Sequence, residues 1–312
     1  MRINIKTNIT AIILVCVVFT LACIYLGQKY TPTFLADKSW ITDFGYTQNE
    51  IYPLTFNRKG DRSCPEIPIK FGNSEYKIGF DTGCGVGIFF TDAIKDKIQY
   101  TYLGKSEELN RDGSHRGWCE NVIIDEFSIF TDKYKNIKTS ISDWTMFSSE
   151  KFNGTVGLAY FKSKIITIDY AGHKIAVRSN PIDYARLNSN DYIVLPLHKT
   201  TSKGQEDLPF FEAQLNGKPV TVYLDTGKNY SYVYNKDCKY RMADKPANLF
   251  DIPLKIGKID LTLHDVAEIH DLAQAEKLPY PTMVELNSDQ LWKCKLLVTF
   301  DLIKQKIIFR KI

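Results

Sequence analysis

The stretch Ile67–Gly83, IPIKFGNSEYKIGFDTG, recurs 144 positions later as Phe211–Gly227, FEAQLNGKPVTVYLDTG. In both copies apolar residues occupy every second position on either side of a Gly-Asn or Asn-Gly pair, and both copies end in Asp-Thr-Gly. Alternation with period two is typical of a half-buried strand, and a central pair of this type favours a tight turn. Each copy therefore predicts a β-hairpin that delivers an Asp-Thr-Gly loop.

A second pair of matching segments follows the first. Thr167–Val177 and Thr299–Phe309 both carry apolar residues at alternate positions around a polar turn, which predicts two further hairpins. The chain therefore contains an internal repeat. A repeat on this scale predicts two similar β-structured lobes, related by a pseudo-two-fold axis.

One Asp-Thr-Gly tripeptide says little, but two copies in matched contexts indicate a shared site. Equivalent loops of a duplicated fold meet at the pseudo-two-fold axis, so we expect Asp81 and Asp225 to face each other. Two adjacent carboxylates cannot both ionise easily, so they share a proton and can act together as base and acid. The threonine hydroxyls can bond across the axis, and the glycines allow tight turns. The supporting residues are Thr82, Gly83, Thr226 and Gly227.

With Phe80–Gly83, Leu224–Gly227 and the later segment Thr155–Phe161, the chain resembles the aspartic protease superfamily of pepsins and retropepsins, most of all single-chain bacterial relatives of the retropepsins. The resemblance covers residues 64 to 312. It implies an all-β fold of two similar β-barrel lobes, a pepsin- or retropepsin-like pseudo-dimer, with a substrate cleft between them. It also implies endopeptidase activity on extended peptides, with Asp81 and Asp225 as the catalytic pair and without a cofactor.

The repeat, the resemblance and a charge-free run near the N-terminus together predict a domain organisation. The predicted parts are residues 1–29 as a cytoplasmic tip and membrane anchor, 30–61 as a stalk, 62–178 as an N-terminal aspartic-protease-like lobe, 179–191 as a linker and 192–312 as a C-terminal lobe of the same kind.

The chain departs from the family pattern at three places. Cys84 and Lys228 follow the two Asp-Thr-Gly loops, where the family has small residues, and Ser288–Lys293, a predicted short helix, replaces an expected apolar-apolar-Gly segment. An ammonium beside the carboxylates would favour ionisation of both and remove the shared proton, unless Lys228 points into solvent. Cys84 is expected either as a buried small residue or as a reactive thiol. The alternative function is therefore a catalytically inactive module that binds peptides or proteins.

A flexible hairpin covers the cleft in this family. The polar segment 110–118, with Asp112, Gly113, Ser114 and His115, has a turn signal at a suitable distance after Asp81. No comparable segment occurs between Asp225 and Ile256, so the sequence predicts one flap. An ordinary exposed loop is the competing interpretation of His115 and Trp118.

The N-terminal residues predict a membrane segment. Arg2 and Lys6 precede Ile9–Leu26, a run without charge that is long enough to cross a bilayer as a helix. We expect a signal anchor in a bacterial cell envelope, with the folded part outside the cytoplasm. A lipoprotein processed at Cys23 and a cleaved signal peptide are the alternatives.

Composition excludes several other classes of protein. The 312 residues include 40 Lys and Arg against 36 Asp and Glu, and the lysines are scattered, so no nucleic-acid partner is expected. No His or Cys cluster has metal-ligand spacing, so no metal is expected. The chain is expected to be a monomer. Up to two disulfides are possible among five cysteines, with the pairing left open: Cys64, Cys84, Cys119, Cys238 and Cys294. A purely structural envelope protein would leave the duplicated loops unexplained.

Overall fold

The computed structural model describes residues 38–58, 61–109, 115–143, 152–238, 246, 248–270, 272 and 275–312. The chain forms two compact units, residues 1–42 and 43–312. The expected anchor at 9–26 and three of the expected flap residues, Asp112, Gly113 and Ser114, lie outside the described residues. Among the residues that are described, no helix has both the length and the apolar character required to cross a membrane.

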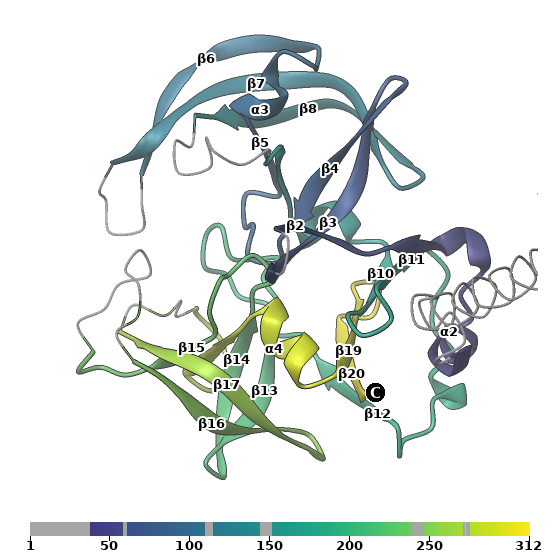
Figure 1. The fold of residues 1–312 in the computed structure, drawn as a ribbon, viewed down its shortest axis with the longest axis vertical. Coiled ribbons are helices and arrows are strands. Elements are labelled where there is room, and N and C mark those ends of the chain that lie inside the picture. Colours follow the sequence, from purple (N-terminus) through teal and green to yellow (C-terminus); the bar gives the residue numbers. More distant parts are fainter. Residues whose placement is uncertain are drawn as a thin grey trace, which may run out of the picture. The chain divides into compact units, whose positions relative to one another are not determined.

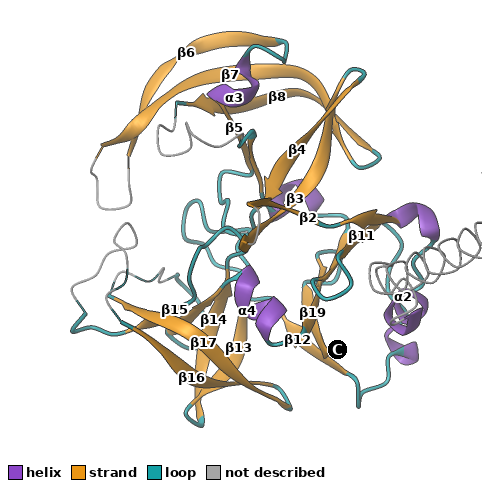
Figure 2. Cartoon of the chain, viewed as in Figure 1, coloured by secondary structure: helices purple, strands orange, loops and turns teal. Residues whose placement is uncertain are grey.

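The described chain is mostly β with few helices, as the sequence predicted (Figure 2). The elements before residue 180 are α2 (Lys38–Phe44), η1 (Gln48–Glu50), β1 (Ile51–Pro53), β2 (Thr55–Arg58), β3 (Asp61–Phe71), β4 (Ser74–Phe80), β5 (Ile88–Thr91), α3 (Asp92–Lys95), β6 (Tyr100–Leu109), β7 (His115–Ile129), β8 (Asp132–Ser142), β9 (Gly154–Val156), η3 (Leu158–Phe161), β10 (Ile165–Asp169) and β11 (Lys174–Arg178). Those after it are η4 (Tyr184–Arg186), β12 (Tyr192–Pro196), β13 (Phe210–Leu215), β14 (Lys218–Leu224), β15 (Tyr232–Tyr234), β16 (Leu249–Ile256), β17 (Ile259–Ile269), β18 (Thr282–Leu286), α4 (Ser288–Lys293), β19 (Leu296–Asp301) and β20 (Lys306–Lys311).

The two hairpins predicted from the repeat are present. β3 pairs antiparallel with β4, and β13 pairs antiparallel with β14. In the second hairpin, Asn216 and Gly217 have φ of 52° and 74°, the left-handed values that a tight hairpin turn with matching twist requires. The residues just before the two aspartates, Phe80 and Leu224, are fully buried. Burial of such side chains contributes about 1.5–3 kcal/mol each and fixes where the hairpins end.

The strands of the second half close into a barrel in the order β13-β14-β18-β15-β17-β16. The first half forms an eight-stranded sheet, β2-β3-β4-β9-β5-β8-β7-β6, with a further pairing between β3 and β7 (Figure 1). The pairings correspond: β4–β9 and β14–β18 are parallel, and so are β5–β8 and β15–β17. Within the described residues, the second half has no counterpart of β6.

A third sheet joins the two halves, in the order β1-β11-β10-β19-β20-β12. The second pair of predicted hairpins, β10–β11 and β19–β20, is present, and β10 pairs antiparallel with β19. At the centre of this pairing Thr167 lies opposite Thr299, and their hydroxyl oxygens are 2.7 Å apart. The structure also differs from the expected stalk, because residues 51–58 form β1 and β2 and pair with β11 and β3.

Candidate active site

Each Asp-Thr-Gly loop is held by a short strand, β9 or β18, that pairs in parallel with the second strand of the preceding hairpin. The backbone N–H of Asp81 donates to the carbonyl of Val156 at 3.0 Å, at the end of β9. The backbone N–H of Asp225 donates to the carbonyl of Leu286 at 2.9 Å, at the end of β18. The two loops therefore occupy equivalent places in their halves.

The threonines lock the two loops together. Thr82 N–H donates to Thr226 Oγ1 at 2.9 Å, and Thr226 N–H donates to Thr82 Oγ1 at 3.0 Å. The Thr82 hydroxyl then donates to the Leu224 carbonyl at 2.7 Å, and the Thr226 hydroxyl to the Phe80 carbonyl at 2.6 Å. Both threonines are fully buried, so each hydroxyl pairs two backbone groups that would otherwise lack partners.

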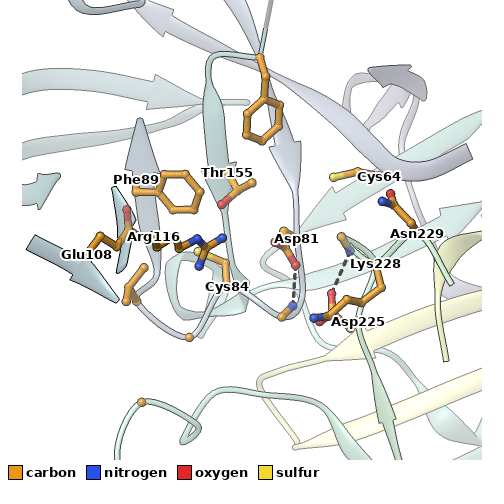
Figure 3. A pocket seen from close by; sticks show the side chains of 16 residues that line it. Cys64, Asp81, Cys84, Phe89, Glu108, Arg116, Thr155, Asp225, Lys228 and Asn229 are labelled. Carbon is orange, nitrogen blue, oxygen red and sulfur yellow. Dashed lines mark hydrogen bonds between the residues drawn. The ribbon is translucent and has the colours of Figure 1, made fainter. Parts of the chain in front are cut away.

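The carboxyl groups face each other across this junction. A β-carbon on Gly83 would overlap the Asp225 carboxyl, and one on Gly227 would overlap the Asp81 carboxyl. Gly83 N–H donates to Asp81 Oδ1 at 2.8 Å and Gly227 N–H to Asp225 Oδ1 at 3.0 Å, the two dashed lines of Figure 3. Burial, together with the charge of Asp225 and a hydrogen bond to it, raises the pKa of Asp81 well above its ordinary value. Opposing contributions from Gly83 N–H and Lys228 are smaller.

Both carboxyls open into a cavity of about 430 Å³ (Figure 3). Its walls come from both halves and from the loop between β12 and β13, which contributes Gly204. Beyond the paired loops, the lining includes Cys64, Cys84, Phe89, Glu108, Arg116, Phe152, Thr155, Lys228 and Asn229. The floor near Cys84 is apolar, because Cys84, Phe89 and Phe152 form one buried cluster.

Lys228 points inward rather than into solvent. Its Nζ lies 3.8 Å from Oε1 of Glu285 on β18, and the two side chains are only 27% and 2% exposed. Burial alone would lower the pKa of Lys228, but the charges of Glu285, Asp225 and Asp81 raise it overall, so the ammonium persists. The sequence interpretation missed Glu285. Its charge opposes that of Lys228, so the expected removal of the shared proton does not follow from Lys228 alone.

The predicted short helix is α4, and the missing glycine has a structural replacement. A β-carbon on Gly157 would overlap the Cys84 carbonyl, which explains the glycine in the first half. Asn287 takes this place in the second half, and its side chain donates to the Lys228 carbonyl at 3.2 Å and accepts from Ser231 Oγ at 3.0 Å. It also caps α4 by accepting from Gln290 N–H at 3.2 Å. The second loop is thus held without the glycine.

The cysteines that line the cavity are buried thiols. Neither Cys64 nor Cys84 takes part in a disulfide. Burial and the nearby Asp81 charge raise the pKa of Cys84 to about 12, and burial raises the pKa of Cys64 well above its ordinary value. Burial thus disfavours the thiolate form of both, which favours Cys84 as a small buried residue over Cys84 as a nucleophile.

The expected flap corresponds to the hairpin of β6 and β7, whose turn is not described. His115, the first residue of β7, is exposed, with its Nδ1 2.8 Å from Glu107 Oε1 and its ring against Trp118. Its neighbour Arg116 lines the cavity, together with Glu108 of β6. Burial lowers the pKa of Arg116, and the charge of Glu108 opposes that shift. The sequence thus indicated the hairpin but missed the residues that turn inward.

No group of three or more His, Cys, Asp or Glu side chains in the described part of the chain is arranged to hold a metal ion. The chemistry available at the cavity is that of two coupled carboxyl groups, with an ion pair beside them.

Comparison with known proteins gives limited information. No protein-family model matches the sequence, and no curated protein matches it. Among solved structures, the chain is similar to basic 7S globulin from soybean, with 10% sequence identity and a TM-score of 0.47, over 84% of this chain and 96% of that one. A similarity this distant says nothing about the chemistry of the site, which has to be judged from its own residues.

Proposed function

We propose that this chain is an aspartic-type endopeptidase with two pepsin- or retropepsin-like lobes. Asp81 and Asp225 are its catalytic pair. The observation that carries the proposal is the mutual contact of the two Asp-Thr-Gly loops, each with its glycine against the other loop's carboxyl group, at the base of a cavity. Since a β-carbon at either glycine would collide with the opposite carboxyl, this close approach of two acids depends on both loop sequences.

The chemistry follows from the shared proton. The ionised carboxylate takes a proton from a water molecule whose oxygen attacks the peptide carbonyl carbon, while the protonated carboxyl donates to the carbonyl oxygen. The tetrahedral species then collapses: the C–N bond breaks, the amine leaves with a proton from the pair, and one hydroxyl of the tetrahedral species returns a proton to the pair as the new carboxylic acid forms. The carboxyls keep one proton in total after the cycle.

The substrate class is a peptide or protein segment in extended conformation. β6 is the end strand of the eight-stranded sheet, and the β6–β7 hairpin contributes Glu108 and Arg116 to the cavity wall. An extended segment fits between a hairpin and a pair of loops, and places alternate side chains on opposite walls. The apolar floor at Phe89 and Phe152 can receive one of these side chains.

The second candidate function is an inactive module of the same fold that binds peptides. What favours it is the Lys228–Glu285 pair beside the carboxyls, because the resemblance leads us to expect a small residue at the position of Lys228. The two candidates differ in outcome, because an inactive module would bind an unstructured protein and release it intact.

The test is cleavage of an unstructured protein by the full-length chain from acid to neutral pH, followed by mass spectrometry. We expect cleavage by the wild type and its loss in Asp81→Asn and in Asp225→Asn, since each half supplies one member of one acid/base unit. Binding without cleavage at every pH would favour the inactive module. A near wild-type rate in either variant would exclude the shared-proton mechanism.

We also propose that Ile9–Leu26 anchors the protein in a bacterial cell membrane, with the folded part outside the cytoplasm. The support is the charge-free run after Arg2 and Lys6. Under this proposal Cys23→Ser stays in the membrane fraction, as the wild type does. A lipoprotein would lose its acyl anchor with Cys23, so release of that variant from the membrane fraction would contradict the signal anchor.

A further inference from the structure

The two halves differ at three equivalent positions around the carboxyl pair. Gly79 and Tyr223 stand two residues before the aspartates, and Cys84 and Lys228 stand three residues after them. β4 pairs Gly79 with Thr155 of β9, and β14 pairs Tyr223 with Glu285 of β18. The first half thus has Gly, Thr and Cys where the second half has Tyr, Glu and Lys.

Tyr223 contacts the catalytic pair directly. Its hydroxyl donates to Asp225 Oδ2 at 3.1 Å, while Gly227 N–H occupies Oδ1 at 3.0 Å. Burial and the charges of Asp225, Glu285 and Asp81 raise the pKa of Tyr223 well above its ordinary value, so the phenol keeps its proton and can only donate to a carboxylate. The ring is held by Phe210, whose centroid lies 5.2 Å away.

Asp81 has no equivalent donor. Gly79 carries no side chain, and a β-carbon there would come within 3.0 Å of Cys64 Sγ, so the space is already taken. Within the part of the chain that the structure describes, Asp81 accepts one backbone bond, from Gly83, and bonds to Asp225. Hydrogen bonds to a carboxylate favour its ionised form. The pair is therefore asymmetric.

We propose that Tyr223 is a positioning residue that holds Asp225 as the ionised member of the pair and leaves the shared proton on Asp81. This inference rests on the proposed function. In that reaction Asp225 takes the proton from the attacking water, and Asp81 donates to the carbonyl oxygen. The tyrosine itself acts through Asp225.

Other titratable groups near Asp225 do not reverse this assignment. They are Asp81, Cys64 and Cys84 of the first half and Lys228, Tyr232 and Glu285 of the second. Arg116 of β7 interacts with Asp81, and it has an opposite charge in Glu108 of β6. Lys228 and Glu285 carry opposite charges and contact each other. Burial raises the pKa of Tyr232 to about 12, so it is neutral, as are the two thiols.

The test follows the carboxyl signals by NMR in the full-length chain, labelled with ¹³C at aspartate Cγ and titrated from acid to neutral pH. Asp81→Asn and Asp225→Asn assign the two signals. In the wild type, loss of the first proton should shift the Cγ signal of Asp225 more than that of Asp81. Loss of the second proton should shift the Cγ signal of Asp81 more. The reverse order would overturn the inference, without any need for a Tyr223 variant.

Tyr223→Phe removes one hydroxyl and keeps the ring. The first proton of the pair should then leave at a pH about one to two units higher, because a hydrogen bond to a charged group is lost. Tyr192→Phe is the matched control: Tyr192 is 3% exposed against 4% for Tyr223, and its hydroxyl donates to the Asp43 carboxylate at 2.7 Å, away from the cavity. An unchanged first step in Tyr223→Phe, or an equal shift in the control, would overturn the inference.

The same variants separate this inference from the proposed function. If the wild type cleaves peptides, the acid limb of its kcat/KM profile should move to higher pH in Tyr223→Phe, together with the first step of the NMR titration. In Tyr192→Phe the acid limb should stay in place. If the wild type cleaves nothing but the NMR order and shift appear, the proposed function fails while the proton assignment stands.

Discussion

Lys228 and Glu285 place an ion pair beside the catalytic carboxyls. A buried ion pair is weak evidence for stability, because the desolvation of two charges offsets their attraction. Its effect on the neighbouring acids is more direct, since Lys228 alone would favour the loss of the shared proton and Glu285 opposes it. We therefore expect the pair to set the pH at which the proton leaves Asp81.

Two substitutions at this pair should act in opposite directions. Lys228→Ser removes a positive charge that lowers the pKa of Asp81. The upper limb of the pH–rate profile should therefore move to higher pH by about one unit. Glu285→Gln leaves the ammonium without its counter-charge, so the same limb should move to lower pH.

Lys293→Ser is the control, because Lys293 is also 27% exposed and pairs with Asp289 at 2.8 Å, but lies on α4 outside the cavity. Its profile should match the wild type. Shifts of the same sign in Lys228→Ser and Glu285→Gln would contradict the account.

Some of these residues could be identified from the sequence, and others could not. Aligning the repeats at an offset of 144 places Tyr223 on Gly79 and Lys228 on Cys84, so these two differences were visible. Glu285 was hidden, since its partner position Thr155 lies 130 residues earlier and only strand register relates the two. The offset changes because β6 lengthens the first half.

At the scale of elements, the four hairpins were predictable because period-two alternation and turn residues are local. The placement of the two Asp-Thr-Gly loops depends instead on β9 and β18, short strands that pair in parallel with β4 and β14. Such pairings join residues far apart in the chain, and period-two alternation does not reveal them; Thr155–Phe161, which begins in β9, was noticed only through the resemblance to the aspartic proteases. The cross-bonded threonines then make the two loops one structural element.

Thr226→Val tests that element. It leaves Thr82 N–H and the Phe80 carbonyl without partners in a buried place. Each orphaned group costs about 1–3 kcal/mol, so the free energy of unfolding should fall by about 2–4 kcal/mol in urea titrations. Thr262→Val, at an exposed position of β17, should change it by less than about 0.5 kcal/mol. Equal losses in both variants would show that the cross-bonds do not hold the loops.

At the scale of the whole molecule, the halves are joined twice, once at the loops and once in the shared sheet. The repeat predicted two similar lobes, but it could not predict that the later hairpins of both halves would pair with each other through β10 and β19. Nothing in either hairpin sequence distinguishes pairing within a half from pairing across the axis. The pairing of residues 51–58 with the sheets was not predictable for a similar reason, because any edge strand with unpaired backbone groups can accept another strand.

The central claim is that the two halves contribute one acid/base unit, and the cleavage rates of Asp81→Asn, Asp225→Asn and the double variant test it most directly. Because neither carboxyl works without the other, each single variant should lose a factor of about 10³ or more in kcat/KM, and the double variant should lose no more than either single one. Losses that multiply in the double variant, or a single variant that keeps the wild-type rate, would show that Asp81 and Asp225 act independently and would contradict the account.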